Sequence, residues 1–229
     1  MEFIIIAIIA VILSVILGIL FGYNLKKVKK ITENKELDEK IKKYPNNIEI
    51  CKSFLKKLNN EKVKVEENSD NEASLYIAVT NKILIANISN TYTRIQTIAH
   101  ECLHSVQNRK ILMFNFIFSN IYLVFFIIIC ILTVCKKLSN EIMYSNIFLI
   151  LSFIYYVIRV FLENDAMIKA QFLAREYMQE SKYIDNSEID KIYHGFEELN
   201  KSCIKSTNCS LFIGIMIKLV IFNVLALIF

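Results

Sequence analysis

Glycine and proline are scarce in this sequence, with four glycines and one proline among 229 residues. Both residue types interrupt regular helices, so their scarcity favours long and unbroken ones. Hydrophobic residues make up 55% of the chain and the mean hydropathy is +0.41, which is above the range typical of soluble domains. We therefore expect a mainly α, multi-span helical membrane protein.

Charged residues are missing from two long stretches, Phe3 to Tyr23 and Ile111 to Cys135. At a rise of about 1.5 Å per residue, each stretch can cross roughly 30 Å of hydrocarbon as a helix. A third stretch, Ile142 to Leu162, contains a single charged residue, Arg159. It lies near the end of the stretch, where a long side chain can reach the membrane interface. The sequence thus predicts three transmembrane spans.

A fourth apolar stretch, Cys209 to Phe229, carries Lys218 near its middle. A lysine at the bilayer centre costs on the order of 3 kcal/mol on insertion scales unless it is paired or hydrated. Two interpretations stay open. In the first, which we favour, the stretch spans fully and Lys218 reaches the interface or faces the helical bundle. In the second, the segment is only half inserted.

Basic residues are in excess, with a formal net charge of +5, but they form no basic surface interleaved with aromatic residues. This argues against a nucleic-acid partner and directs the charge argument to membrane topology. The first span has no basic residue before it and no small-residue cleavage site, whereas the basic stretch NLKKVKK follows it. The positive-inside rule predicts a retained anchor in the cell membrane, with the amino terminus outside and the following polar region in the cytoplasm.

Cysteines occur six times without a CxxC pair. This spacing gives no indication of disulfides, and the expected topology places most of the thiols in a reducing compartment or in lipid. The cysteines are Cys51, Cys102, Cys130, Cys135, Cys203 and Cys209.

The alternation of apolar and polar stretches divides the chain into five expected segments. The last cytoplasmic segment ends in a helix that is capped by Asn186 or Ser187. The segments are an amino-terminal transmembrane anchor (1–25), a cytoplasmic region (26–110), a hairpin of two spans (111–162), cytoplasmic helices (163–206) and a carboxy-terminal transmembrane segment (207–229).

The cytoplasmic region combines helical and strand patterns. Two short helices are predicted, one in ELDEKIKKY, which stops before Pro45, and one in IEICKSFLKKLN. A short alternating run, VKVEE, precedes a β-hairpin in SLYIAVTNKILIANI, whose turn is expected near Thr80 to Lys82. A longer helix follows, capped by Asn90 or Thr91 and extending to about Arg109.

This longer helix contains the stretch TIAHECLHSVQ, in which His100 and His104 are two of only three histidines. Positions i and i+4 project from one face of a helix, so both imidazoles can lie about 2 Å from one zinc ion. Glu101 lies about 100° around the helix, where it cannot coordinate the ion but can take a proton from metal-bound water. Residue frequencies alone would produce HExxH in roughly three of a thousand shuffled chains. The alternative is two core or capping histidines beside a surface glutamate.

A two-histidine zinc site needs a third protein ligand, with water in the fourth position. The remaining histidine, His194, lies too far beyond the motif to extend it, so a carboxylate is expected. The two spans within 111–162 run antiparallel, and Glu163 therefore returns to the membrane face where the motif lies. Asp165 is the reserve ligand or an acceptor for a histidine N–H. The alternative for Glu163 is an interfacial charge at a helix start.

The motif and the order of the elements resemble the neutral zinc metallopeptidases that are integral membrane proteins, within the gluzincin group. AHECLHSVQ stands in place of AHExGHAxQ, ENDAMIKA stands in place of an ExxASRRA-like stretch, and the likeness covers most of the chain. The resemblance implies a small zincin-like α+β domain that carries the β-hairpin. It also implies Zn²⁺ bound by His100, His104 and Glu163, with Glu101 as the catalytic base.

The sequence departs from the family pattern at Cys102 and Leu103, and again after the third ligand at Met167 and Ile168. These departures leave the substrate preference open. Tyr193 and His194 are also considered for stabilising a transition-state oxyanion. A lone histidine on a polar helix is more often a surface residue, so neither is assigned.

The expected function is hydrolysis of peptide bonds by zinc-activated water at the cytoplasmic face of the lipid bilayer, with a peptide or membrane-protein substrate. Such enzymes bind an extended substrate along an edge strand. Lys82 to Ala86 is the candidate, with a purely structural strand as the alternative. The alternative functions are a non-catalytic membrane scaffold with a structural zinc site and a zinc hydrolase of a lipid-linked amide.

Overall fold

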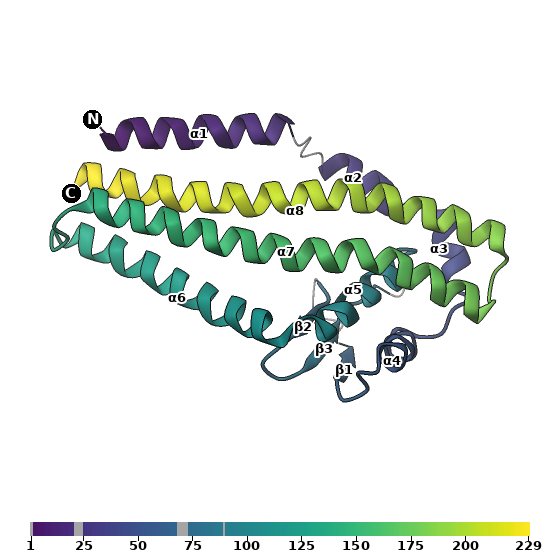
Figure 1. The fold of residues 1–229 in the computed structure, drawn as a ribbon. Helices are drawn as coiled ribbons and strands as arrows, with labels where there is room; N and C mark the ends of the chain where they lie inside the picture. The colour runs from purple at the N-terminus through teal and green to yellow at the C-terminus, as the bar shows by residue number, and fades with distance from the viewer. Residues whose placement is uncertain (1, 21–24, 68–72, 89) are drawn as a thin grey trace. The chain divides into compact units, whose positions relative to one another are not determined.

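A computed structural model describes residues 2–20, 25–67, 73–88 and 90–229, and Figure 1 shows the path of the chain. The described residues are mainly helical, with one small sheet of three strands. The chain divides into two compact units. We name them the apolar unit, from residues within 1–23, 114–161 and 205–229, and the polar unit, from residues within 24–113 and 162–204.

Among the described residues, three helices are long and apolar enough to cross a membrane, which marks the chain as a candidate membrane protein. They are α6 (Arg109–Val134), α7 (Glu141–Ser181) and α8 (Asn186–Ile228). Helix α1 (Glu2–Leu20) is also apolar, but the stretch found in it, Phe3–Ile16, is shorter. The expected end of the first span, Tyr23, lies outside the described residues, so this span stays a prediction.

Polar side chains in the apolar unit are buried against one another. Ser152 Oγ lies 3.0 Å from Tyr122 Oη, and Ser145 Oγ lies 3.2 Å from Asn223 Oδ1. Lys218 Nζ lies 5.7 Å from the centroid of the Tyr122 ring. The Lys218 side chain therefore faces α6 of the same unit, and helix α8 is continuous around it.

The polar unit begins with helices α2 (Leu25–Thr32), α3 (Lys35–Ile41) and α4 (Asn47–Lys57), continues with strands β1 (Lys64–Glu67), β2 (Leu75–Ile77) and β3 (Lys82–Ile85), and includes helix α5 (Arg94–Val106). Strands β2 and β3 form the expected antiparallel hairpin. Strand β1 pairs in parallel with the other side of β3, so the strand order is β1-β3-β2. The two expected short helices are confirmed as α3 and α4.

Helix α4 starts with an N-cap at Asn46. The Asn46 side chain accepts a hydrogen bond of 2.9 Å from the Glu49 backbone N–H and donates one of 2.8 Å to the Glu49 carboxylate. The cap satisfies the Glu49 backbone N–H, one of the donors that a helix start otherwise leaves open. Ile50 and Phe54, one turn apart, are fully buried and direct the apolar face of α4 into the core.

The core of the polar unit packs around α5. Buried apolar side chains come from α4, from alternate positions of β3, from α5 and from the polar halves of α7 and α8. The sheet and α4 thereby fix α5 on one side, and α7 and α8 fix it on another. Its fully buried members include Ile50, Phe54, Ile83, Ile85, Ile98, Ala99, Cys102, Ala166, Ala170, Ile192 and Phe196.

The start of α5 differs from the sequence prediction. Asn90 and Thr91 were expected as caps, but the helix begins at Arg94, and the Arg94 backbone N–H donates to the carbonyl of Thr91 in a preceding turn. The Tyr92 backbone N–H is held by Asp38 at 2.8 Å. This tertiary contact fixes the segment before the helix, so the expected local cap does not form.

The expected edge strand, Lys82 to Ala86, is also corrected. Strand β3 is central because β1 pairs with one side and β2 with the other. Its backbone groups are therefore engaged on both sides and cannot pair with an extended substrate. Among the described residues, the sheet edges are β1 and β2.

The carboxy-terminal helices merge where the sequence predicted separate segments. Helix α8 runs without a break from Asn186 to Ile228. The sequence predicted Asn186 or Ser187 as the cap of this helix, but the cap is Asp185. Its carboxylate accepts hydrogen bonds from the Glu188 backbone N–H at 2.8 Å and from the Ser187 hydroxyl at 2.7 Å. The sequence contains no proline or glycine between the two predicted segments that would stop the helix.

Candidate metal centre

His100 and His104 project from the same face of α5. Their Nε2 atoms lie 3.0 Å apart and their rings meet edge to face, with centroids 4.5 Å apart. The neighbouring positions Ala99 and Cys102 are fully buried, so the helix cannot rotate the histidine face away without exposing its core side. Helical spacing and core packing together fix the pair.

Glu163 on α7 completes a group of three. Its Oε2 atom lies 3.5 Å from His100 Nε2 and 3.6 Å from His104 Nε2. The three side chains are only 12 to 17% exposed, so they meet in a shielded position that still opens to solvent. One ligand atom from each residue lies within 4.8 Å of the others, and the group could hold a metal ion.

The orientation of His104 is set by a chain of hydrogen bonds through Gln107. The Gln107 amide nitrogen donates to the Leu162 carbonyl at 2.8 Å and to Asp165 Oδ2 at 3.1 Å. The amide oxygen is therefore left to face His104 Nδ1, at 2.8 Å. An oxygen acceptor requires a proton on Nδ1, so the neutral ring directs an unprotonated Nε2 toward Glu163.

Glu101 is buried beside this group, with an exposed fraction of 6%. Burial raises the pKa of its carboxyl group, while His100, His104 and a hydrogen bond from the Tyr76 backbone N–H oppose the increase. Its charge also interacts with that of Glu163. The carboxylate therefore lies close to the group, between α5 and strand β2.

The pKa of His104 is also raised. Burial lowers its pKa, but the hydrogen bond to Glu163 and the negative charges of Glu163 and Glu101 outweigh burial and raise the pKa above the ordinary value. A proton and a metal ion would be attracted to Nε2 by the same charges.

Asp165, the reserve ligand, does not join the group. Its carboxylate pairs with Lys169 at 2.5 Å and accepts the Gln107 amide. Burial raises its pKa, but the hydrogen bonds from Lys169 and Gln107 and the charge of Lys169 outweigh that effect and hold the pKa below its usual value. The acidic residue thus orients His104 through Gln107, where the sequence analysis expected a direct histidine contact.

Tyr193 and His194 also lie apart from the group. The Tyr193 ring packs under the Arg175 guanidinium, whose carbon lies 4.4 Å from the ring centroid. His194 is exposed on α8. Nothing in these contacts brings either residue to the metal-ligating side chains.

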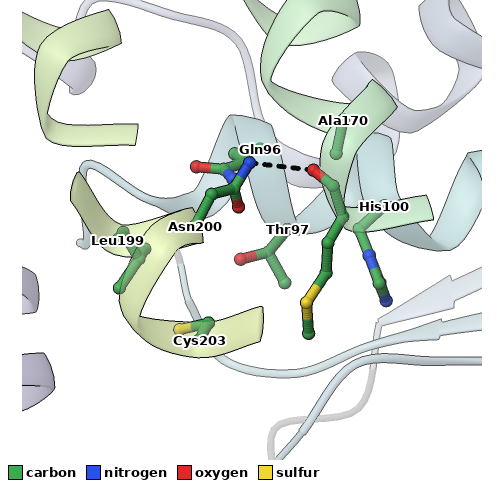
Figure 2. A pocket seen from close by; sticks show the side chains of 8 residues that line it. Gln96, Thr97, His100, Ala170, Leu199, Asn200 and Cys203 are labelled. Atoms are coloured by element: carbon green, nitrogen blue, oxygen red, sulfur yellow. Dashed lines mark hydrogen bonds between the residues drawn. The ribbon is translucent and has the colours of Figure 1, made fainter. Parts of the chain in front are cut away.

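A cavity of about 170 Å³ lies beside His100. Side chains from three helices, α5, α7 and α8, line it. Figure 2 shows these side chains arranged around the space in front of His100. The other lining residues are Gln96, Thr97, Met167, Ala170, Leu199, Asn200 and Cys203.

Sequence reasoning identified the three members of the group but missed Gln107 and the α8 wall of the cavity. Gln107 lies three residues after His104 in the quoted motif, a spacing that places both side chains near one helix face. Helical spacing could therefore have identified it. No local pattern marks Leu199, Asn200 or Cys203, because their position depends on the packing of α8 against α5.

Comparison of the chain with known protein families, with curated proteins and with solved structures finds no match. The family suggested by the motif consequently stays a prediction. The function has to be argued from the geometry of His100, His104 and Glu163 and from the residues around them.

Proposed function

We propose that the chain is a membrane-associated zinc metallopeptidase of the neutral, gluzincin-like type. The observation that carries this proposal is the triangle formed by two Nε2 atoms and one carboxylate oxygen, with sides of 3.0, 3.5 and 3.6 Å. Ligand atoms bound at about 2.0–2.1 Å around a tetrahedral zinc ion are separated by roughly 3.3 Å. The triangle therefore has the dimensions of one face of such a tetrahedron.

The donor set supports zinc over other ions. Two imidazoles and one carboxylate are typical of catalytic zinc sites, in which the fourth position remains for water or substrate. Magnesium and calcium favour sites composed mostly of oxygen ligands. When bound, the zinc ion would lower the pKa of its water and polarise the substrate carbonyl.

Glu101 is the proposed general base. It follows His100 directly on α5, and its carboxyl group interacts with both imidazoles. A buried carboxylate with a raised pKa accepts a proton more readily than an exposed one. Glu101 would take a proton from the attacking water and pass it to the departing amine.

Strand β2 is the proposed docking strand for an extended peptide. It lies at an edge of the sheet among the described residues and packs against α5. Tyr76, in its centre, contacts the carboxylate of Glu101 through its backbone. A peptide that extends the sheet at β2 would therefore run beside the proposed base.

The proposed setting is the cell membrane, with the site facing the cytoplasm. Support comes from the three candidate spans and from the basic residues that follow α1. Fusion of alkaline phosphatase and of a cytoplasmic fluorescent reporter after residue 110 tests the orientation. Fluorescence without phosphatase activity is expected, and the reverse pattern would place the site outside.

A metal analysis beside a digest tests the chemistry. Purified wild type should carry one zinc ion per chain and cleave unstructured protein or a peptide library. His104→Ala and Glu163→Ala should lose zinc and activity together, whereas Glu101→Gln should retain zinc and lose hydrolysis. His194→Ala is the matched control, because it removes a histidine outside the group and should leave both properties unchanged.

Three outcomes would contradict the proposal. Equal cleavage by wild type and Glu101→Gln would show that another protease is responsible for the digest. Bound zinc without cleavage of any peptide would favour a structural zinc site in a membrane scaffold. Activity on lipid-linked amides alone would redirect the assignment to that substrate class.

A further inference from the structure

The cavity beside His100 has a chemistry of its own. Apart from His100, none of the described residues that line it is acidic or basic. Met167, Ala170, Leu199 and Cys203 give it mostly apolar walls, and Figure 2 shows Leu199 and Cys203 on α8, at the opposite side of the view from His100. Burial raises the pKa of the Cys203 thiol, which keeps this wall uncharged at neutral pH.

The polar groups of the cavity are largely engaged with one another. The Asn200 amide nitrogen donates to the Met167 carbonyl at 2.9 Å, as the dashed line in Figure 2 shows. The Asn200 oxygen then accepts the Gln96 amide at 2.5 Å, and the Thr97 hydroxyl donates to the Thr93 carbonyl at 3.1 Å. These bonds tie α5, α7 and α8 together, so the cavity is held by a fixed frame.

The size of the cavity indicates what could enter it. A buried cavity of about 150 Å³ lined by apolar side chains accommodates benzene, and the volume here is about 170 Å³. A leucine, methionine or phenylalanine side chain is comparable in size. A charged side chain would lose its hydration there without meeting an opposite charge, which is strongly unfavourable.

We propose that this cavity receives the side chain of a substrate residue next to the scissile bond and selects uncharged, apolar side chains up to the size of phenylalanine. The inference rests on the proposed peptidase function. A carbonyl held at the metal centre lies next to His100, and His100 also lines the cavity. The side chain that flanks that carbonyl would thus be the one nearest to the cavity.

Cys203 is the proposed specificity determinant. It stands on the α8 wall and is partly accessible, whereas Ala170 and Leu199 are buried. Replacing Cys203 by leucine adds volume to the cavity without adding charge. Replacing Met167 by alanine has the opposite effect and enlarges the cavity from the α7 side.

A peptide library read by mass spectrometry tests the proposal with zinc-loaded, detergent-purified protein. Wild type should prefer leucine, methionine or phenylalanine on one side of the cleaved bond and exclude aspartate, glutamate and lysine there. Cys203→Leu should lower kcat/KM for peptides with these large residues by roughly 10–100-fold, and peptides with glycine or alanine at that position should become the best substrates. Met167→Ala should shift the preference toward larger aromatic residues.

Lys201→Leu serves as the control, because it makes an apolar substitution on an exposed part of α8 and should leave the preference unchanged. Zinc content shows that each variant has folded around its metal centre.

Cleavage with an unchanged preference in both Cys203→Leu and Met167→Ala would overturn the inference while leaving the peptidase function intact. A wild-type preference for charged residues at both flanking positions would also overturn it. A zinc-loaded wild type that cleaves no peptide overturns the proposed function, and this inference with it.

Discussion

His104 Nδ1 and Gln107 Oε1 lie 2.8 Å apart at the carboxy-terminal end of α5. Because the Gln107 amide nitrogen already donates to Leu162 and Asp165, its oxygen is the atom that meets the ring. The contact selects the neutral tautomer with the proton on Nδ1, and it holds the ring in one orientation. An amide that is not itself a proposed metal ligand thereby orients one of the ligands.

Gln107→Leu is expected to weaken zinc binding by about 10–100-fold, the range typical of lost support behind a ligand. Leucine fills similar space but cannot accept a hydrogen bond from the His104 Nδ1–H, so the ring loses its preferred tautomer and orientation. Zinc affinity measured by competition with a fluorescent chelator checks the expectation.

Asn108→Ala is the matched control for Gln107→Leu. Asn108 is the neighbouring amide, and its oxygen caps the start of α6 by accepting the Lys110 backbone N–H at 2.9 Å. Its loss should affect the helix start but leave the zinc affinity within experimental error. Equal losses of affinity in both variants would mean that the segment between α5 and α6 matters as a whole, and that Gln107 has no specific role.

Protonation of His104 should couple metal binding and stability to pH in opposite directions. Its pKa is raised in the folded protein, because the hydrogen bond to Glu163 and nearby negative charges outweigh burial. In metal-free protein, the stabilising contribution is fully present below the unfolded value near 6.5 and is lost as the pH rises through the higher folded value. Zinc competes with that proton, so zinc affinity should increase over the same range.

Glu163→Gln removes the carboxylate charge that favours protonation of His104. In chelator-treated samples, the melting temperature of wild type should exceed that of Glu163→Gln most clearly between about pH 5 and 6.5, and the difference should shrink at higher pH. With saturating zinc the difference should instead grow with pH. A difference that does not vary with pH without metal would mean that the two groups are not coupled in the folded chain.

The members of the candidate centre were predictable because each follows from a short-range rule. Helical spacing alone places His100 and His104 on one face, and chain reversal between two apolar spans returns Glu163 to the same region. The hairpin of β2 and β3 was also predictable from alternation and a turn signal. In each case a few neighbouring residues or a simple topological constraint carry the information.

The remaining features depend on contacts between distant segments. The parallel pairing of β1 with β3 makes β3 central, and no alternation within Lys82 to Ala86 reveals that neighbour. Asp38 holds the segment before α5 from a position far earlier in the chain, which overrides the local capping signals of Asn90 and Thr91. The cavity wall on α8 depends likewise on packing across about one hundred residues of sequence.

Arg94→Met should destabilise the polar unit by about 2–4 kcal/mol. The Arg94 guanidinium is 3% exposed and donates to the carbonyls of Pro45, Ile41 and Tyr44 at 2.9 to 3.0 Å. These bonds join the start of α5 to the end of α3 and the loop before α4. Methionine fills the space but leaves several buried acceptors unsatisfied, and each bond to a charged donor contributes roughly 1.5–3 kcal/mol.

Arg175→Met is the control for Arg94→Met. Arg175 pairs with Asp190 at 2.7 Å, and the two side chains are 37% and 61% exposed, far more than Arg94. An exposed pair contributes about 0–1 kcal/mol, so this variant should melt close to wild type. Thermal unfolding followed by circular dichroism in detergent compares the two. A larger loss for Arg175→Met than for Arg94→Met would contradict the role given to the buried guanidinium.

Lys218 and Tyr122 should be energetically coupled within the apolar unit. The ammonium lies 5.7 Å from the ring centroid, and a desolvated cation over an aromatic face gains about 2 kcal/mol. That gain offsets part of the roughly 3 kcal/mol cost of a lysine deep in an apolar span. Tyr122→Leu should therefore destabilise wild type by about 1–2 kcal/mol more than it destabilises a Lys218→Met background. Tyr122→Phe is the control for the hydroxyl group that contacts Ser152. This variant loses that contact but keeps the aromatic ring, so the coupling to Lys218 should remain.

The measurement is reversible unfolding in lipid bicelles for all four members of the cycle. Strictly additive effects would show that Lys218 is stabilised by water or lipid headgroups and not by the ring.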